Sequence, residues 1–148
     1  GDHGWHLGEH AIWGKHALFE ESLRSPLIIS YPGIPQPGKP THSIVETLDV
    51  FPTVCELAGL KVPTYLDGQS LLPILRNPKT KGHPAISYRG NAQTIRTRTH
   101  RLIVHKNGEF ELYDHRTPDA ETKNLAGSQP KLVAQLNKTL STRLNTGN

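Results

Sequence analysis

Prolines and glycines interrupt this chain at short intervals and limit it to short helices and strands. The 148 residues include 12 prolines and 13 glycines. Proline fixes φ and removes a backbone donor, and glycine favours turns, so both residues break regular structure. The hydrophobic fraction of 34% is also low for a free-standing globular protein. The pattern therefore predicts the loop-rich part of a larger protein rather than a compact bundle.

The first fifteen residues gather most of the groups that can do chemistry. Residues 1–10 read Gly-Asp-His-Gly-Trp-His-Leu-Gly-Glu-His, and Lys15 follows. Glycines on either side of Asp2-His3 allow the backbone to bend so that both side chains converge. A carboxylate beside an imidazole suits a divalent cation such as calcium or magnesium. Lys15 offers a positive charge to an anionic substrate group. The alternative interpretation is a surface turn with solvated histidines.

The distribution of charge limits the classes of partner that the chain is expected to bind. The formal net charge is +4, which is compatible with anionic partners. The densest basic cluster runs from Arg96 to Lys106, but no aromatic residue lies between Arg89 and Phe110. Because a nucleic-acid surface usually interleaves aromatic with basic residues, we expect no nucleic-acid partner. We interpret the cluster as a solvated strand face, with contact to an anionic saccharide as the alternative.

Cysteine content and hydropathy argue against an internal disulfide and against a membrane-spanning segment. Cys55 is the only cysteine, so the chain forms no internal disulfide. It lies in an apolar run, where a free thiol behaves as a small buried hydrophobe. No apolar run approaches the ~20 residues that span a bilayer. We therefore expect no membrane partner.

Apolar spacing and turn residues predict helices and a strand in the first half of the chain. Pro26 ends the first helical pattern, because the residue before proline avoids helical geometry. Asp49 is expected to cap the second helix, and Gly59 to stop it. The predicted elements are an interrupted helix over residues 10–23, a buried strand over 27–31, a helical region over 41–60 and a short helical turn over 70–75.

The second half changes character and predicts an antiparallel meander followed by a helix. Asn107-Gly108 lies between two strand-like runs, which is a strong hairpin signal. A polar connection over residues 114–127 leads to an amphipathic stretch with apolar residues at helical intervals. The predicted elements are strands over 85–88, 93–98, 101–105 and 110–113 and a helix over 130–144.

Short motifs occur along most of the chain in one order. They are residues 1–10, 13–15, 19–22, 24–28, 31–33, 47–53, 56–60, 67–71 and 111–114, followed by Asp119, Glu121 and 124–126. Read together, these motifs resemble the C-terminal part of the sulfatase family, within the alkaline-phosphatase-like superfamily. Among sulfatases the chain is most similar to the iduronate-2-sulfatase-like group, in which Asp-His stands at the metal position.

The resemblance implies an α/β fold, or α+β for this segment alone. Residues 1–82 would be the C-terminal part of the large α/β sandwich domain. Residues 83–148 would form a small subdomain, an antiparallel sheet with a C-terminal helix packed on it. The first segment would expose strand edges that a missing N-terminal part of the same protein should cover, so we expect self-association of the isolated segment.

The resemblance also implies site residues. Asp2 and His3 match the family's two late calcium ligands, and Lys15 matches the catalytic lysine that contacts the sulfate group of the substrate. His6 would line the substrate cleft, with an unremarkable, partly exposed histidine as the alternative. A hard cation and an ammonium near a sulfate would stabilise the charge that develops on the ester oxygens during hydrolysis.

One expected feature is missing from the sequence. Sulfatases of this type use a formylglycine made from the first residue of a Cys/Ser-X-Pro/Ala-X-Arg motif. Cys55 is followed by Glu-Leu-Ala-Gly, and no such motif occurs. The formylglycine and the remaining calcium ligands are therefore expected upstream, and this chain alone is expected to bind calcium weakly and to be inactive.

The predicted function is thus a sulfatase that hydrolyses sulfate esters, of a sulfated saccharide or an aryl sulfate, in glycosaminoglycan degradation. The family resemblance implies a periplasmic or secreted location. One alternative is a phosphodiesterase or phosphonate hydrolase of the same superfamily, because sulfate and phosphate esters are similar tetrahedral anions. The other alternative is a non-catalytic module that binds anionic glycans.

Overall fold

The computed structural model describes residues 1–145 and divides the chain into two compact units. Unit 1 joins Gly1–Ile28 to the residues from Ile86 onward, and unit 2 is Ile29–Ala85. These units differ from the predicted division at residues 82 and 83, because the first 28 residues pack with the C-terminal sheet. The predicted place of residues 1–82 in the large domain of a longer protein stays a prediction.

A four-stranded sheet forms the centre of unit 1. Its strands are β3 (Ala85–Arg89), β4 (Ala92–Arg96), β5 (His100–His105) and β6 (Phe110–Asp114), in that spatial order. Antiparallel pairing of β4, β5 and β6 places Leu102 opposite both Ile95 and Leu112. The predicted meander is confirmed, and the predicted Asn107-Gly108 turn joins β5 to β6.

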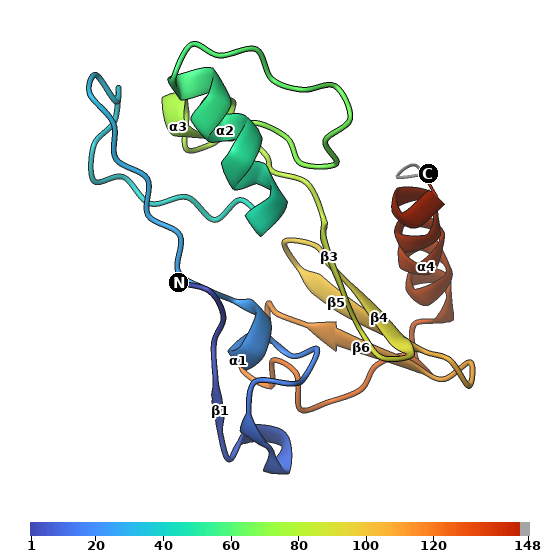
Figure 1. Cartoon of the computed structure of the whole chain (residues 1–148). Helices are drawn as coiled ribbons and strands as arrows, with labels where there is room; N and C mark the ends of the chain where they lie inside the picture. The colour runs from blue at the N-terminus through green and yellow to red at the C-terminus, as the bar shows by residue number, and fades with distance from the viewer. Residues whose placement is uncertain (146–148) are drawn as a thin grey trace. The chain divides into compact units, whose positions relative to one another are not determined.

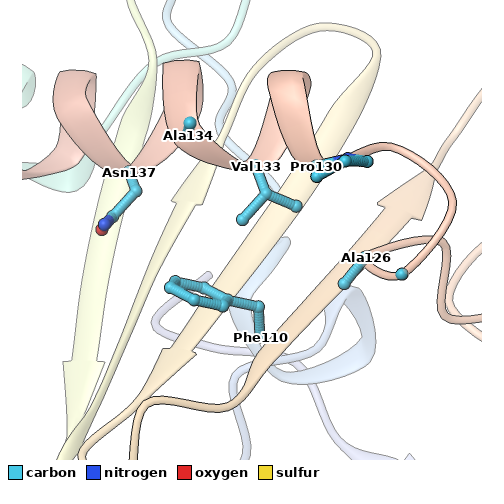
Figure 2. A pocket seen from close by; sticks show the side chains of 7 residues that line it. Phe110, Ala126, Pro130, Val133, Ala134 and Asn137 are labelled. Atoms are coloured by element: carbon cyan, nitrogen blue, oxygen red, sulfur yellow. The ribbon is translucent and has the colours of Figure 1, made fainter.

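Helix α4 (Pro130–Asn145) covers one face of this sheet, as Figure 1 shows in red beside the strands. The predicted C-terminal helix is therefore confirmed. The buried core between helix and sheet consists of Ile95, Leu102, Leu112, Val133, Leu136 and Leu140. At the edge of this core, Phe110 and Val133 line an apolar hollow of about 480 Å³ (Figure 2).

The N-terminal segment packs on the opposite face of the sheet. It contains β1 (His6–Leu7), the 3₁₀ turn η1 (Glu9–Ala11), β2 (Trp13–Gly14) and the short helix α1 (Glu20–Leu23). Leu18 packs there with Ile103 and Tyr113. The predicted helix over residues 10–23 is wrong except for its last turn. His10 and Ala11 have φ angles of 54° and 55°, which a right-handed helix does not allow.

Unit 2 contains η2 (Thr47–Asp49), α2 (Val50–Leu57) and α3 (Leu72–Arg76). The predicted helical region over 41–60 is thus shorter than expected. Its glycine stop is confirmed, because Gly59 has a φ of 70° and the Leu60 N–H donates to the Cys55 carbonyl at 2.9 Å.

One other prediction about the first half is wrong. Residues 27–31 form no strand, and Ile28 is 91% exposed. A strand needs a hydrogen-bonded neighbour, and no strand within residues 1–145 pairs with this run. Within the same described range, no helix has the length and hydrophobicity that a membrane crossing requires.

Candidate active-site segment

The β1–β2 hairpin brings the predicted site residues together. Asp2 and His3 precede β1, and Lys15 directly follows β2. Because His6 pairs with Gly14 in the hairpin, the segments before and after it run side by side. The Lys15 ammonium donates to His3 Nε2 at 2.7 Å, and His3 Nε2 lies 3.7 Å from Asp2 Oδ2. Three residues that are up to 13 positions apart therefore meet at one point.

His3 has the protonation pattern of a metal ligand. Its Nδ1 lies 2.7 Å from the Gly4 carbonyl oxygen, and a carbonyl can only accept, so Nδ1 carries the proton. Nε2 then presents a lone pair, which is the state that binds a metal. The Asp2 side chain is 94% exposed and has room to turn toward a cation.

The predicted calcium site fits these residues only in part. Calcium takes six to eight oxygen ligands, and Asp2 and His3 supply two side chains. Among residues 1–145, neither belongs to a group of three or more metal-ligating side chains. The donors present suit one side of a cation site, and the remaining ligands would have to come from outside this chain.

The position of His6 differs from the prediction that it lines a substrate cleft. Its side chain is fully buried, with Nδ1 2.9 Å from Ser22 Oγ and the ring in edge contact with Phe19. A side chain without solvent exposure offers no surface to a saccharide, so the burial argues against direct contact with substrate.

Gly4 anchors the Asp2-His3 turn against α1. The Gly4 N–H donates to the Ser22 carbonyl at 2.8 Å. A Cβ atom at Gly4 would lie 1.8 Å from the Glu21 carbonyl oxygen, so only glycine allows this close approach.

A buried ion-pair network connects α1 to the sheet. Arg101 is 1% exposed and donates to Glu20 Oε2 at 2.6 Å and to Glu121. Arg96 also donates to Glu20 Oε2, at 3.1 Å. The prediction of a solvated arginine face is therefore wrong for Arg101, whose guanidinium lies inside unit 1, and Arg96 is ion-paired. Arg98 remains exposed.

Glu121 is the centre of this network. Besides Arg101, it accepts the Glu20 N–H at 2.6 Å and contacts His115 Nε2 at 3.1 Å. Burial raises the pKa of Glu121, but the His115 hydrogen bond, the Arg101 charge and the Glu20 N–H outweigh it and lower the pKa to about 2. The carboxylate is therefore ionised at neutral pH and holds α1, with the segment before it, on the sheet.

A second polar cluster lies in unit 2. Asp49 is fully buried and accepts from the Glu46 N–H at 2.7 Å, the Gln69 N–H at 2.8 Å and His83 Nε2 at 2.9 Å. Burial raises the pKa of Asp49, but these bonds outweigh it and lower the pKa. The hydrogen bond to Asp49 raises the pKa of His83. Asp49 thus connects separate loops. It occupies the N-cap position of α2, as predicted, but its side chain makes no capping hydrogen bond to that helix.

Sequence reasoning missed the roles of Glu20 and Glu121. Both lie within motifs that carry the family resemblance, but nothing local indicates their partners. Glu20 is 81 positions from Arg101 in the sequence, so only the folded chain reveals the pair.

Comparison with known proteins identifies the family. Residues 8–147 match the family model described as N-sulphoglucosamine sulphohydrolase, C-terminal. An N-acetylglucosamine-6-O-sulfatase of Bacteroides thetaiotaomicron is 34% identical over 85% of this chain and 25% of its own length. A Δ4,5-hexuronate-2-O-sulfatase of the same organism is 36% identical, over 84% of this chain and 29% of its own.

Solved structures agree with this assignment. A crystal structure of a sulfatase from Bacteroides thetaiotaomicron superposes with a TM-score of 0.85 and 30% identity, over 98% of this chain and 35% of that one. The predicted α/β fold class is thereby confirmed. The chain spans about a quarter to a third of the length of these relatives. It belongs to the sulfatase family of the alkaline-phosphatase-like superfamily and corresponds to the C-terminal family model.

Proposed function

We propose that this chain contributes the late part of the active site of a sulfatase that hydrolyses sulfate esters of saccharides. The observation that carries the proposal is the convergence of Lys15, His3 and Asp2, with a 2.7 Å contact between the Lys15 ammonium and His3 Nε2. An ammonium, an imidazole whose Nε2 lone pair accepts from that ammonium in this structure, and an exposed carboxylate lie at one point. With Lys15 turned to a sulfate oxygen and Nε2 to a cation, this set suits a divalent cation and an anionic ester.

Each side chain has a distinct role in this proposal. Lys15 would bind a sulfate oxygen and stabilise the charge that develops there in the transition state. Asp2 and His3 would hold one side of a calcium ion, which would neutralise negative charge on the bound sulfate. A formylglycine from an upstream segment would supply the nucleophile, because this chain has no Cys/Ser-X-Pro/Ala-X-Arg motif.

The framework around these residues supports a fixed site. The buried Glu20–Arg101–Glu121 network holds α1 against the sheet, and the Gly4 N–H bond to Ser22 ties the Asp2-His3 turn to α1. Preorganised charges act more strongly on a transition state than mobile ones.

For the substrate, we propose a sulfated hexuronate or glucosamine residue, because relatives carry the names hexuronate-2-O-sulfatase and N-acetylglucosamine-6-O-sulfatase. The Asp2-His3 pair favours the iduronate-2-sulfatase-like specificity. A periplasmic or secreted location is proposed from the family resemblance.

The experiment compares variants of the complete sulfatase that carries this segment. Release of sulfate is measured with 2-O- and 6-O-sulfated disaccharides, with an aryl sulfate and with a phosphonate monoester. We expect Lys15→Ala to lower kcat about 100-fold, as for removal of one transition-state donor. Lys39→Ala is the matched control, because Lys39 is an exposed lysine in unit 2. Equal activity of the two variants, or preferred turnover of the phosphonate, would contradict the proposal.

Calcium binding is tested separately by calorimetry. The chain alone is expected to bind calcium weakly, because it offers two ligands to an ion that takes six to eight. In the complete protein, Asp2→Ala should weaken calcium binding. Unchanged binding would remove Asp2 from the site.

A further inference from the structure

Three metal-ligating side chains from separate elements of unit 1 meet behind the active-site segment. They are His6 of β1, His10 of η1 and Glu21 of α1. Glu21 Oε2 lies 3.5 Å from His6 Nε2 and 3.8 Å from His10 Nε2. The three ligand atoms all lie within 4.8 Å of one another.

Two of these atoms are buried without a hydrogen-bond partner. His6 Nε2 and Glu21 Oε2 are inaccessible to water and form no hydrogen bond within the described residues. The His6 side chain as a whole has no exposed surface. Because an unsatisfied buried polar atom costs on the order of 1–3 kcal/mol, a facing pair of them indicates a missing bound group.

The surroundings of His6 favour a metal ion as that group. Ser22 Oγ lies 2.9 Å from His6 Nδ1, the type of outer-shell contact that fixes the ring of a metal-bound histidine and leaves Nε2 to the ion. With metal–nitrogen distances of about 2.0–2.1 Å, two ligand atoms of a tetrahedral zinc ion lie ~3.4 Å apart. The observed separations of 3.5 and 3.8 Å are close to that spacing.

Stacking against Phe19 fixes the position of the His10 ring. Its ring stacks on Phe19 with a centroid distance of 3.8 Å and an interplanar angle of 2°. Its side chain is 17% exposed, so solvent reaches the cluster from one side. A water molecule can therefore complete the coordination that the protein side chains begin.

The described residues contain two other groups of three metal-ligating side chains, Glu20–His115–Glu121 and Glu46–Asp49–His83. In both groups, carboxylates already have ion-pair or hydrogen-bond partners. Glu20 and Glu121 are paired with Arg101. Asp49 is hydrogen-bonded to His83 and to two backbone N–H groups. Within residues 1–145, the His6–His10–Glu21 cluster differs because its facing ligand atoms are left without hydrogen bonds.

We propose that His6, His10 and Glu21 bind one divalent transition-metal ion of the zinc class. Two imidazoles and one carboxylate are donors that zinc accepts readily. The site is separate from Asp2 and His3, which take no part in this cluster. The ion would crosslink β1, η1 and α1 and so stiffen the hairpin that carries Lys15.

The test uses the metal-stripped chain and zinc chloride. Calorimetry should detect one zinc ion per chain, and the thermal unfolding midpoint should rise with added zinc. Cobalt substituted for zinc should give the visible absorption of a tetrahedral nitrogen–oxygen site. His10→Ala should weaken zinc binding at least as much as the roughly 10–100-fold loss that follows removal of an outer-shell partner.

Two control variants distinguish zinc binding at this cluster from zinc binding at an exposed histidine or at the Asp2-His3 pair. His16→Ala removes an exposed histidine of the same segment and should leave zinc affinity unchanged, as should Asp2→Ala. Glu21→Gln keeps the side-chain shape and removes the charge, so it replaces His10→Ala if that variant is misfolded by circular dichroism. Absence of zinc binding by the folded chain, or binding that survives both His10→Ala and Glu21→Gln, would overturn the proposal.

Discussion

The buried carboxylate of Glu121 offers the sharpest test of how the active-site segment is held. Glu121 is 3% exposed and contacts Arg101, His115 and the Glu20 N–H. Glu121→Gln keeps the shape of the side chain and removes its charge. Arg101 then keeps Glu20 as its one carboxylate partner, and the desolvation of its guanidinium is compensated only in part.

The magnitude follows from the pKa of the carboxyl. Its ordinary value of 4.5 falls to about 2 in the folded chain. A pKa difference of one corresponds to 1.36 kcal/mol, so this difference corresponds to about 3 kcal/mol of stability. Breaking a buried ion pair by removing one partner costs a comparable ~3–5 kcal/mol. We therefore expect Glu121→Gln to lower the free energy of unfolding by about 3 kcal/mol.

The pH dependence gives a second readout with a defined sign. Because folding lowers the pKa of Glu121, its contribution is fully present above pH 4.5 and is lost as the pH falls toward 2. Urea unfolding followed by circular dichroism, at pH 7 and at steps down to pH 2.5, measures both effects. The difference between the native chain and Glu121→Gln should shrink over this range.

The matched control is Glu109→Gln, in the exposed turn between β5 and β6. It removes the same charge from a solvated position and should change stability by less than about 0.5 kcal/mol. Equal effects of Glu109→Gln and Glu121→Gln at pH 7 would refute the reasoning, because the network would then contribute no more than a surface charge.

Three further predictions concern other parts of the chain. Gly4→Ala should lower the thermal unfolding midpoint, because the new Cβ would lie 1.8 Å from the Glu21 carbonyl oxygen; an unchanged midpoint would contradict the close approach. Leu140→Ala should cost ~2–5 kcal/mol in urea unfolding, since Leu140 lies on the sheet-facing side of α4 and is 1% exposed; a cost under about 1 kcal/mol would count against that packing. Folding raises the pKa of His83 through its bond to Asp49, so its contribution is present below pH 6.5 and is lost as the pH rises through the raised value. His83→Gln should abolish this dependence in urea titrations between pH 5.5 and 9, and persistence of the slope would assign it to another group.

The site could be predicted in part. Asp2, His3 and Lys15 were identified from residue type and family resemblance, and the 2.7 Å contact between Lys15 and His3 shows that they meet. Their roles toward calcium and sulfate stay predictions. The burial of His6 and the pairing of Arg101 were not foreseen, because exposure depends on which surface a segment packs against and not on the segment itself.

The sequence by itself determined the elements whose signals are local. Helix α4 follows from apolar residues at helical spacing, the β5–β6 hairpin from Asn107-Gly108, and the end of α2 from Gly59. Local signals suffice there because the stabilising contacts join residues that are near in sequence.

Only the tertiary structure decided which distant segments meet. Residues 27–31 have the composition of a buried strand, yet they form none because no neighbour pairs with them. Glu20 reaches Arg101 across 81 positions, and β1, η1 and α1 bring His6, His10 and Glu21 together. Such contacts depend on the packing of whole elements around a shared core, and no spacing within one segment encodes them.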